Sequence, residues 1–469
     1  MLDSIIEFAN TIFQPLIDLG AAPMMMILIT IFALLMRVNI TKAIEGGFKL
    51  AVAITGMGVV IDLLTTSFSE PLQQFVANTG IQLSVTDIGW APEATITWAS
   101  PYTLFFLLIL VIINIVMIVL NRTNTLDVDI FNFWHVAILG IIIMYYTDNL
   151  LIATIFATVI GVLKFINSDL MKPTFNDMLD MPEGNPTTTT HLNFMLNPII
   201  MVFNKIFDKF FYKLDKYDFD AAKLNNKIGF WGSKFAIGGY LGVFIGLVGQ
   251  QTPQAIFNLA FTGAVSLELF SYVGSWFISA LEPLSQGITD FMAKRFPGRE
   301  FYIGIDWPFV GARPEMWAVA NILAPILLIV ALFLPGNRIL PLAGIIAIGL
   351  TPALLIVTRG KMIRMLIIGV IMIPLFLWSG TMVAPVVTDL AQSIGAFPDG
   401  LAASQQISHS TKEGPVVTML ASLIGMAFEN FDVTLIVLAL LGVAAYVLLF
   451  IWYANEMKKR NAKYEESQS

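Results

Sequence analysis

Long apolar runs without charged residues constrain this chain more than any other feature of its sequence. No charged residue occurs from Val433 to Tyr453. A helix that crosses the hydrocarbon core of a bilayer needs about 20 consecutive apolar residues. Across the chain 57% of the residues are hydrophobic and 13% are charged, whereas roughly 25% are charged in soluble domains. The sequence therefore predicts an all-α integral membrane protein.

Eleven runs have the length and composition of membrane-spanning helices. They cover residues 22–38, 44–66, 103–120, 129–146, 150–166, 230–249, 254–281, 316–334, 339–357, 362–380 and 431–453. The apolar stretch 5–19 is shorter, which favours a helix at the membrane surface or one that enters the membrane halfway. We therefore expect about 11 transmembrane helices.

Basic residues indicate which ends of these helices face the cytoplasm. Lys458, Lys459, Arg460 and Lys463 follow the last run, so we expect a cytoplasmic C-terminus. An odd number of spans then places the N-terminus outside. The first ten residues contain no Lys or Arg, so a cleaved signal peptide is not expected. The chain has no cysteine, which excludes disulfides and thiolate chemistry.

Short motifs recur in order and indicate an internal duplication. Glu70-Pro71-Leu72 recurs 212 positions later as Glu282-Pro283-Leu284, and Asn121-Arg122 recurs 216 positions later as Asn337-Arg338. Chance recurrence is the alternative. Five spans in each copy would insert the copies in opposite directions, and inverted repeats are typical of transporters. We therefore expect two inverted repeats.

The expected domains are a first repeat over 1–166, a cytoplasmic linker over 167–229, and a second repeat with a cytoplasmic tail over 230–469. Apolar residues between Ile199 and Leu214 fall at helical spacing with lysines between them. This pattern predicts an amphipathic helix on the inner membrane face.

Two polar segments interrupt the apolar pattern at corresponding places. Residues 85–100 and 301–308 combine Gly and Pro with hydroxyls, carboxylates and tryptophans. Such breaks are tolerated at membrane depth only where they face protein or a water-filled cavity. Asp87 recurs 219 positions later as Asp306, so both carboxylates are candidates for binding sugar hydroxyls. The alternative is an ordinary surface loop, with tryptophans such as Trp98 at the membrane interface.

The three histidines of the chain differ in their surroundings. His135 begins an apolar helix, and a histidine at membrane depth is a candidate functional residue, although a helix-end histidine bonded to a carbonyl is equally compatible. Asp127 or Asp129 is a candidate N-cap of that helix. His191 ends a polar stretch of the linker. The alternative interpretation of this stretch is a solvated loop without a binding role. For His409 the sequence favours an outer loop.

The sequence contains no Walker motif, no metal-ligand cluster, no nucleophile elbow and no basic patch typical of nucleic-acid binding. We therefore expect no cofactor, no ATP hydrolysis and no nucleic-acid partner. Three classes remain: a sugar permease, an ion-coupled secondary transporter, and a membrane enzyme acting on lipid-linked sugars. The last would need a paired acid and base, and the sequence offers no such pair beyond Asp306.

Three stretches together resemble one known family. VTDIGWAPEATITWAS at 85–100, LDVDIFNFWHVAILG at 126–140, and REFYIGIDWPFVG with PGNRILPLAGIIAIG within 299–349 are similar to the galactitol-type IIC permease of the bacterial sugar phosphotransferase system. The resemblance extends from about residue 20 to 450.

The resemblance implies a multi-pass protein of the bacterial cell membrane. A IIC subunit binds a sugar or polyol, and its IIA and IIB partners supply the phosphoryl group, so IIC is not itself an enzyme. Related permeases are homodimers in which a core domain moves against a fixed dimerisation domain.

Carried over motif by motif, the resemblance assigns substrate binding to Thr86, Asp87, His135, His191 and Asp306. The family's linker carries Pro-His-Gly-Thr-Ser, whereas this chain reads Pro186-Thr187-Thr188-Thr189-Thr190-His191. This departure leaves galactitol, another polyol, a hexose and a pentose as candidate substrates.

Overall fold

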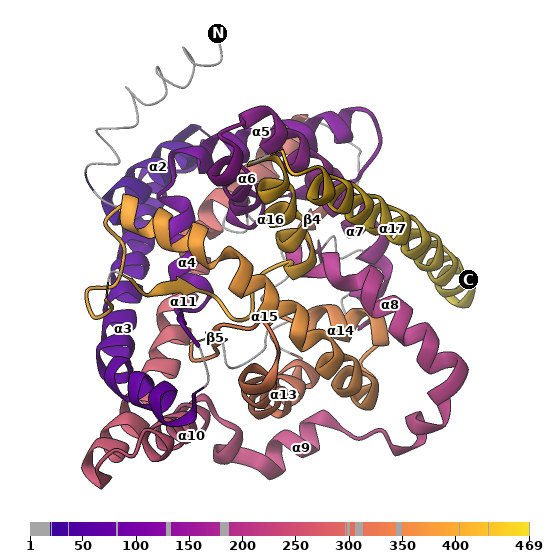
Figure 1. Cartoon of the computed structure of the whole chain (residues 1–469). Coiled ribbons are helices and arrows are strands. Elements are labelled where there is room, and N and C mark those ends of the chain that lie inside the picture. The colour runs from indigo at the N-terminus through magenta and orange to yellow at the C-terminus, as the bar shows by residue number, and fades with distance from the viewer. Residues whose placement is uncertain are drawn as a thin grey trace.

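The chain forms a helical protein in which six very short strands sit between the helices (Figure 1). The computed structural model describes residues 19–468, except for positions 20, 36, 81–82, 128–132, 179–186, 296, 298–300, 305–312, 344–348, 403 and 430. The helices are α2 (Ala21–Leu35), α3 (Ile40–Thr79), α4 (Trp90–Trp98), α5 (Pro101–Val119), α6 (Trp134–Thr147), α7 (Leu150–Met178), α8 (Asn197–Ile206), α9 (Ala221–Ile228), α10 (Lys234–Val248), α11 (Pro253–Arg295), α13 (Pro314–Phe333), α14 (Thr351–Thr358), α15 (Met362–Ser393), α16 (Pro415–Glu429) and α17 (Val433–Gln468).

Several of these helices are long and apolar enough to cross a bilayer, which confirms a multi-pass membrane protein. Among the described residues five meet this test: Ile40–Val60, Tyr102–Val119, Leu150–Phe175, Met362–Ser393 and Val433–Lys463. A sixth is possible if the segment Asn226–Gly232 and α10, which meet at 48°, form one broken span. The count of eleven spans stays a prediction.

One part of the predicted span pattern is wrong. The run 339–357 is not one helix, because it begins with a strand at Ile339–Leu340 and ends with the eight-residue α14. The cause is that hydropathy measures apolar length and does not report how the chain folds back within a run. No span was expected within 381–430, and this segment contains the apolar helix α16.

Helices α2, α3, α10 and α11 pack mainly against one another and form one bundle, while most of the remaining helices pack together beside it. The backbones of α10 and α11 approach each other closely at glycines. A Cβ added at Gly238 would lie 2.2 Å from the carbonyl oxygen of Gly263, so only glycine allows the two backbones to meet there. Small residues at such crossings are a common means of packing helices in membranes.

The six strands form two small parallel sheets of three strands each. The first sheet has the order β5 (Ile339–Leu340), β1 (Val85–Asp87), β6 (Gln406–Ser408). The second has the order β2 (Thr125–Asp127), β4 (Tyr302–Gly304), β3 (Thr187–Thr188). In each sheet the central strand comes from one half of the chain and both outer strands come from the other half. The sheets therefore join the two halves at the centre of the molecule.

The core lies around α6 and α14. The residues of α6 from Trp134 to Met144 are all buried, and so is every residue of α14. A helix that is apolar on all sides is typical of a position surrounded by protein. In contrast, α17 exposes Val437, Leu440, Leu441 and Leu448 by 50% or more, which is suited to contact with lipid.

Candidate functional site

Two loops from opposite halves of the chain meet over the beginning of α6. The first follows β3 and runs from Thr189 to Asn193, and the second follows β6 and runs from His409 to Gly414. The amide of Gly414 donates a 2.9 Å hydrogen bond to Oδ1 of Asn193. The short parallel strands thus bring residues more than 200 positions apart into direct contact.

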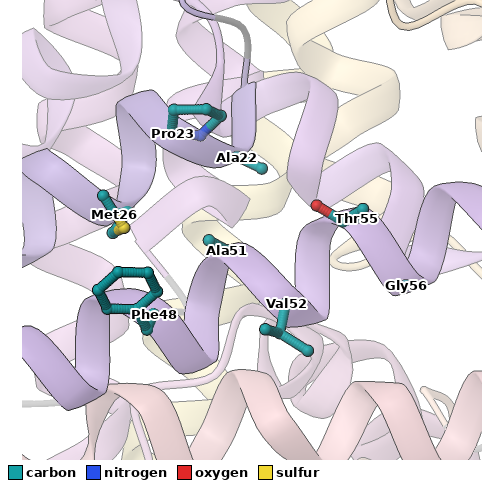
Figure 2. A pocket seen from close by; sticks show the side chains of 8 residues that line it. All are labelled: Ala22, Pro23, Met26, Phe48, Ala51, Val52, Thr55 and Gly56. Carbon is teal, nitrogen blue, oxygen red and sulfur yellow. The ribbon is translucent and has the colours of Figure 1, made fainter.

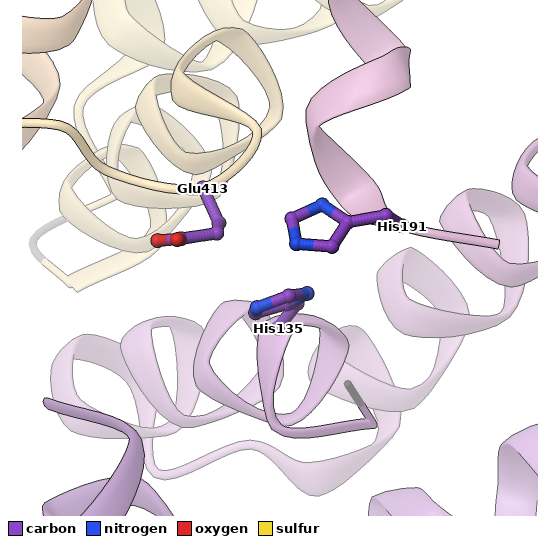
Figure 3. A group of neighbouring side chains, drawn as sticks. All are labelled: His135, His191 and Glu413. Carbon is purple, nitrogen blue, oxygen red and sulfur yellow. The ribbon is translucent and has the colours of Figure 1, made fainter. Parts of the chain in front are cut away.

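At this junction His135, His191 and Glu413 converge, each from a different segment (Figure 3). The ring centroids of the two histidines are 4.4 Å apart. One ligand atom from each of the three residues lies within 4.8 Å of the others. His135 is 2% exposed and Glu413 is 8% exposed. His191 is half-buried, so the three side chains form a largely buried polar cluster.

No metal-ligand cluster was expected from the sequence, yet His135, His191 and Glu413 are residue types that can bind a metal ion. Nδ1 of His191 accepts a 3.2 Å hydrogen bond from the amide of Asn193. A neutral ring that accepts at Nδ1 carries its proton at Nε2, and Figure 3 shows this second nitrogen pointing toward the cluster. A protonated nitrogen cannot bind a metal ion. The cluster therefore fits a hydroxylated ligand better than it fits a metal.

Other polar atoms around the cluster lack hydrogen-bond partners among the described residues. They include Oε2 of Glu413, Nδ1 of His135 and Nε1 of Trp134. Buried polar groups in proteins are normally hydrogen-bonded, so donors and acceptors left unpaired together indicate a place for a polar ligand. A carboxylate acceptor beside imidazole donors and an aromatic ring suits sugar or polyol hydroxyls.

His409 lies at one side of the cluster and links it to the first sheet. It is 1% exposed, so the interpretation of His409 as part of an outer loop is wrong. Its Nε2 is 3.6 Å from Oε2 of Glu413, and its Nδ1 is 3.7 Å from Oδ1 of Asp87. The sequence could not show this position because His409 stands between weakly apolar segments.

Asp87 is fully buried at the end of β1, and its carboxylate holds three segments together. Oδ1 accepts from the amides of Gly89 (3.0 Å) and Ser410 (3.1 Å). Oδ2 accepts from the amide of Leu342 (2.9 Å) and from Oγ of Ser410 (2.6 Å). Protein groups thus occupy both oxygens. A role in contacting substrate stays a prediction.

The other predicted residues are distributed as follows. Thr86 is half-buried in β1 and pairs in register with Leu340 and Ile407. Asp306 lies outside the described residues, two positions after β4 ends. Trp98 is 4% exposed, so a place at the membrane interface is wrong for it.

The second sheet carries a carboxylate in a matching place. Asp127 ends β2, and its Oδ1 accepts a 2.6 Å hydrogen bond from Thr190, two residues past β3. Ser410, which binds Asp87, likewise stands two residues past β6. Asp127 also pairs with the buried Lys164 at 2.7 Å. It therefore stabilises the second sheet and does not cap α6.

Glu93 of α4 and Lys412 of the second loop form an ion pair in which both side chains are fully buried. The Lys412 ammonium also lies 5.7 Å from the ring centroid of Trp134, the neighbour of His135. The pair fixes the loop that carries Glu413 to α4. Sequence reasoning missed both residues, although the adjacent charges Lys412 and Glu413 beside the apolar run of α16 were a usable signal.

An open groove elsewhere in the protein is less suited to a hydroxylated ligand than this cluster. It lies between α2 and α3 (Figure 2) and is lined by Ala22, Pro23, Met26, Phe48, Ala51, Val52, Thr55 and Gly56. Thr55 supplies the one hydroxyl of this lining. A hydroxylated ligand needs several donors and acceptors, so the groove is suited to apolar contacts.

Comparison with known proteins shows the family of the chain. A family model described as the PTS system sugar-specific permease component matches residues 15–400. The chain is 28% identical over 460 residues to a putative permease IIC component of Escherichia coli K12, covering 96% of this chain and 98% of that protein. It is 25% identical over 397 residues to the galactitol-specific EIIC component of the same strain, covering 83% and 86% respectively. The chain belongs to the sugar-specific permease (IIC) family of the phosphotransferase system and is a membrane transport subunit, with phosphorylation carried out by its IIB partner.

Proposed function

We propose that this permease binds galactitol or a closely similar polyol at the cluster of His135, His191 and Glu413. The main observation that supports this proposal is that unpaired, buried donors and acceptors converge where loops of both halves meet. One relative is a galactitol-specific component, which supports a linear polyol. His135 and Glu413 are buried and His191 is half-buried, so most of the cluster is shielded from water.

Each residue of the cluster has a distinct role in this proposal. His191 donates a hydrogen bond through Nε2, because its Nδ1 already accepts one from the backbone. Glu413 accepts from one or two hydroxyls, and His135 completes the site from the beginning of α6. Lys412 and Glu93 hold the Glu413 loop in place.

We include Thr86, Asp87 and Asp306 in the proposed site as a second group of residues beside the cluster. Asp87 holds Ser410 through two of its four hydrogen bonds and lies 3.7 Å from Nδ1 of His409. Thr86 lies next to it in β1. Asp306 follows β4, the central strand of the second sheet, as a candidate direct contact.

The two-copy organisation is also part of the proposal. Pro71 interrupts α3 and Pro283 interrupts α11, and these two long helices pack together. The two sheets, with a central strand exchanged between halves, support an inverted repeat with units 1–166 and 230–469 joined by the linker 167–229. In an inverted repeat the substrate site lies near the midplane at the junction of the copies, and this proposal is supported by the contact between loops of both halves of the chain at the cluster.

Transport follows from this arrangement. We propose that the bundle of α2, α3, α10 and α11 stays fixed and forms a homodimer, and that the remaining helices move with the bound polyol. The C-terminus faces the cytoplasm of a bacterial cell, and the N-terminus faces outward. IIB phosphorylates the polyol when the site opens inward, so that the sugar cannot return.

Calorimetric titration of polyols into the purified protein tests the site. Glu413→Gln and His135→Ala should each weaken galactitol binding about tenfold to a hundredfold, the loss expected for a hydrogen bond to a charged or buried group. Tyr446→Phe is the matched control, because it removes a buried hydrogen bond to Met195 outside the cluster and should leave binding unchanged.

Equal binding by all variants would show that the site lies elsewhere. Binding of hexoses or pentoses in place of polyols would be compatible with the proposed site but would show that the proposed substrate is wrong. Uptake of unmodified sugar in cells that lack IIB, abolished by an ionophore, would favour an ion-coupled transporter over a phosphotransferase permease.

A further inference from the structure

We propose that residues 205–217, which follow α8 and precede α9, form a binding site for anionic phospholipid headgroups. This basic arc, as we call residues 205–217, comprises the end of α8, a π-helical turn at Phe207–Phe211 and a 3₁₀ segment at Tyr212–Tyr217. The chain between α8 and α9 runs along the outer edge of the molecule (Figure 1).

The two acidic residues of the arc, and Asp218 after it, bind groups at the start of α15. Asp208 binds Arg364 at 2.6 Å, and Asp215 binds the same guanidinium through both oxygens at 2.7 and 2.8 Å. Asp218 accepts a 3.0 Å hydrogen bond from the amide of Ile363. All three carboxylates thus converge on the N-terminus of α15, where the helix dipole also favours negative charge.

The lysines of the arc are left on the outer side. Lys209, Lys213 and Lys216 are exposed. Lys205 differs, because it binds Glu456 of α17 at 2.6 Å. The four lysines of the arc outnumber its two carboxylates, Asp208 and Asp215. Both carboxylates pair with Arg364, so the outer surface of the arc carries a net positive charge.

Aromatic side chains stand between these lysines. Phe210 is 64% exposed and Tyr217 is 62% exposed, and Phe211 and Tyr212 are exposed by about half. The ammonium of Lys209 lies 5.1 Å from the Phe210 ring centroid. Aromatic residues interleaved with lysines are typical of the membrane–water interface.

This composition favours lipid over a protein as the occupant. Cores of protein–protein interfaces are depleted in lysine, whereas lysines beside an anionic lipid surface each strengthen binding about fivefold. The exposed aromatic rings would reach the boundary between headgroups and acyl chains, while the lysines meet the phosphates. Because Arg364 ties the arc to α15, bound lipid would also hold that helix at the membrane surface.

The full-length protein purified in neutral detergent provides the test. Its 9 tryptophans and lack of cysteine make intrinsic fluorescence a suitable readout of thermal unfolding. Phosphatidylglycerol should raise the unfolding temperature and appear as bound lipid in native mass spectra. Phosphatidylcholine and inorganic phosphate should do neither, and high salt should remove the effect of phosphatidylglycerol because charges are then screened within about 3 Å.

The variant Lys209→Gln/Lys213→Gln/Lys216→Gln should weaken phosphatidylglycerol binding at least tenfold. The control Lys42→Gln/Lys458→Gln/Lys463→Gln removes the same number of exposed charges outside the arc and should bind as the wild type does. The proposal is overturned if the first variant binds phosphatidylglycerol normally or if the control loses as much affinity. It is also overturned if the first variant keeps lipid binding and instead loses binding to IIB, since the arc would then be a protein-docking surface.

Discussion

The buried ion pair between Glu93 and Lys412 gives the sharpest test of how the site is held. Both side chains are fully buried, and the pair connects α4 to the loop that carries Glu413. Lys412→Met and Glu93→Gln each remove one charge while nearly keeping the side-chain volume. Each single variant leaves the other charge buried without its partner.

The structure sets the size and order of the effects. Removing one partner of a buried pair costs about 3–5 kcal/mol, whereas replacing both with neutral side chains is often close to neutral. The loss of stability caused by Lys412→Met should lie at the upper end of this range, because the Glu93 carboxylate stays buried without its partner. Glu93→Gln should cost less, because the neighbouring Glu413 still attracts the Lys412 ammonium. The double variant should recover most of the loss.

Unfolding in mixed micelles with increasing dodecyl sulfate, followed by tryptophan fluorescence, measures these free energies. A double-mutant cycle then isolates the coupling between the two residues. We expect a coupling of about 2 kcal/mol or more. If the effects of the single variants simply add in the double variant, or if each costs less than about 0.5 kcal/mol, the pair does not hold the loop.

Three further predictions concern other contacts. Ser410→Ala removes a hydrogen bond to the Asp87 carboxylate and should lower the unfolding free energy by about 1.5–3 kcal/mol, measured in the same dodecyl sulfate titration. Gly238→Ala places a methyl group against the backbone of α11 and should cost about 1–3 kcal/mol, visible as a lower unfolding temperature. The Arg364 guanidinium lowers the pKa of Asp215 to about 2, so the contribution of this carboxylate to stability is complete above about pH 4 and is lost as the pH falls toward 2. Asp215→Asn should therefore flatten the acid limb of the stability profile, and an unchanged limb would contradict this assignment.

Apolar run length determined most of the helical architecture. The predicted runs 150–166 and 362–380 fall within helices, and the run 103–120 extends one residue past the end of α5; all three helices begin within two residues of the predicted start. This agreement has a simple reason: a run of this length without charges is stable only where its backbone bonds are satisfied within one helix and its side chains avoid water. The same reasoning failed at 339–357, where a strand and a short helix share one apolar run.

The motifs that broke the apolar pattern contain two residues of the proposed site. His135 and His191 were both singled out from the sequence, and the structure places their rings in contact. Asp87 was singled out as well, but its surroundings are protein donors from the residues after β6 and after β5. The sequence identified it as an unusual carboxylate in an apolar region and could not say which groups satisfy it.

The sequence by itself determined a multi-pass helical membrane protein with polar breaks at fixed places along the chain. Only the tertiary structure decided which of these polar segments lie next to one another. His409, Lys412 and Glu413 look like an outer loop because their neighbours in sequence are weakly apolar, yet strand β6 pairs with β1, about 320 positions away, and carries them into the core. Burial of a polar residue depends on such long-range pairing and on partners such as Glu93 and Asn193. Local hydropathy averages over neighbours in sequence, whereas the site is formed by neighbours in space.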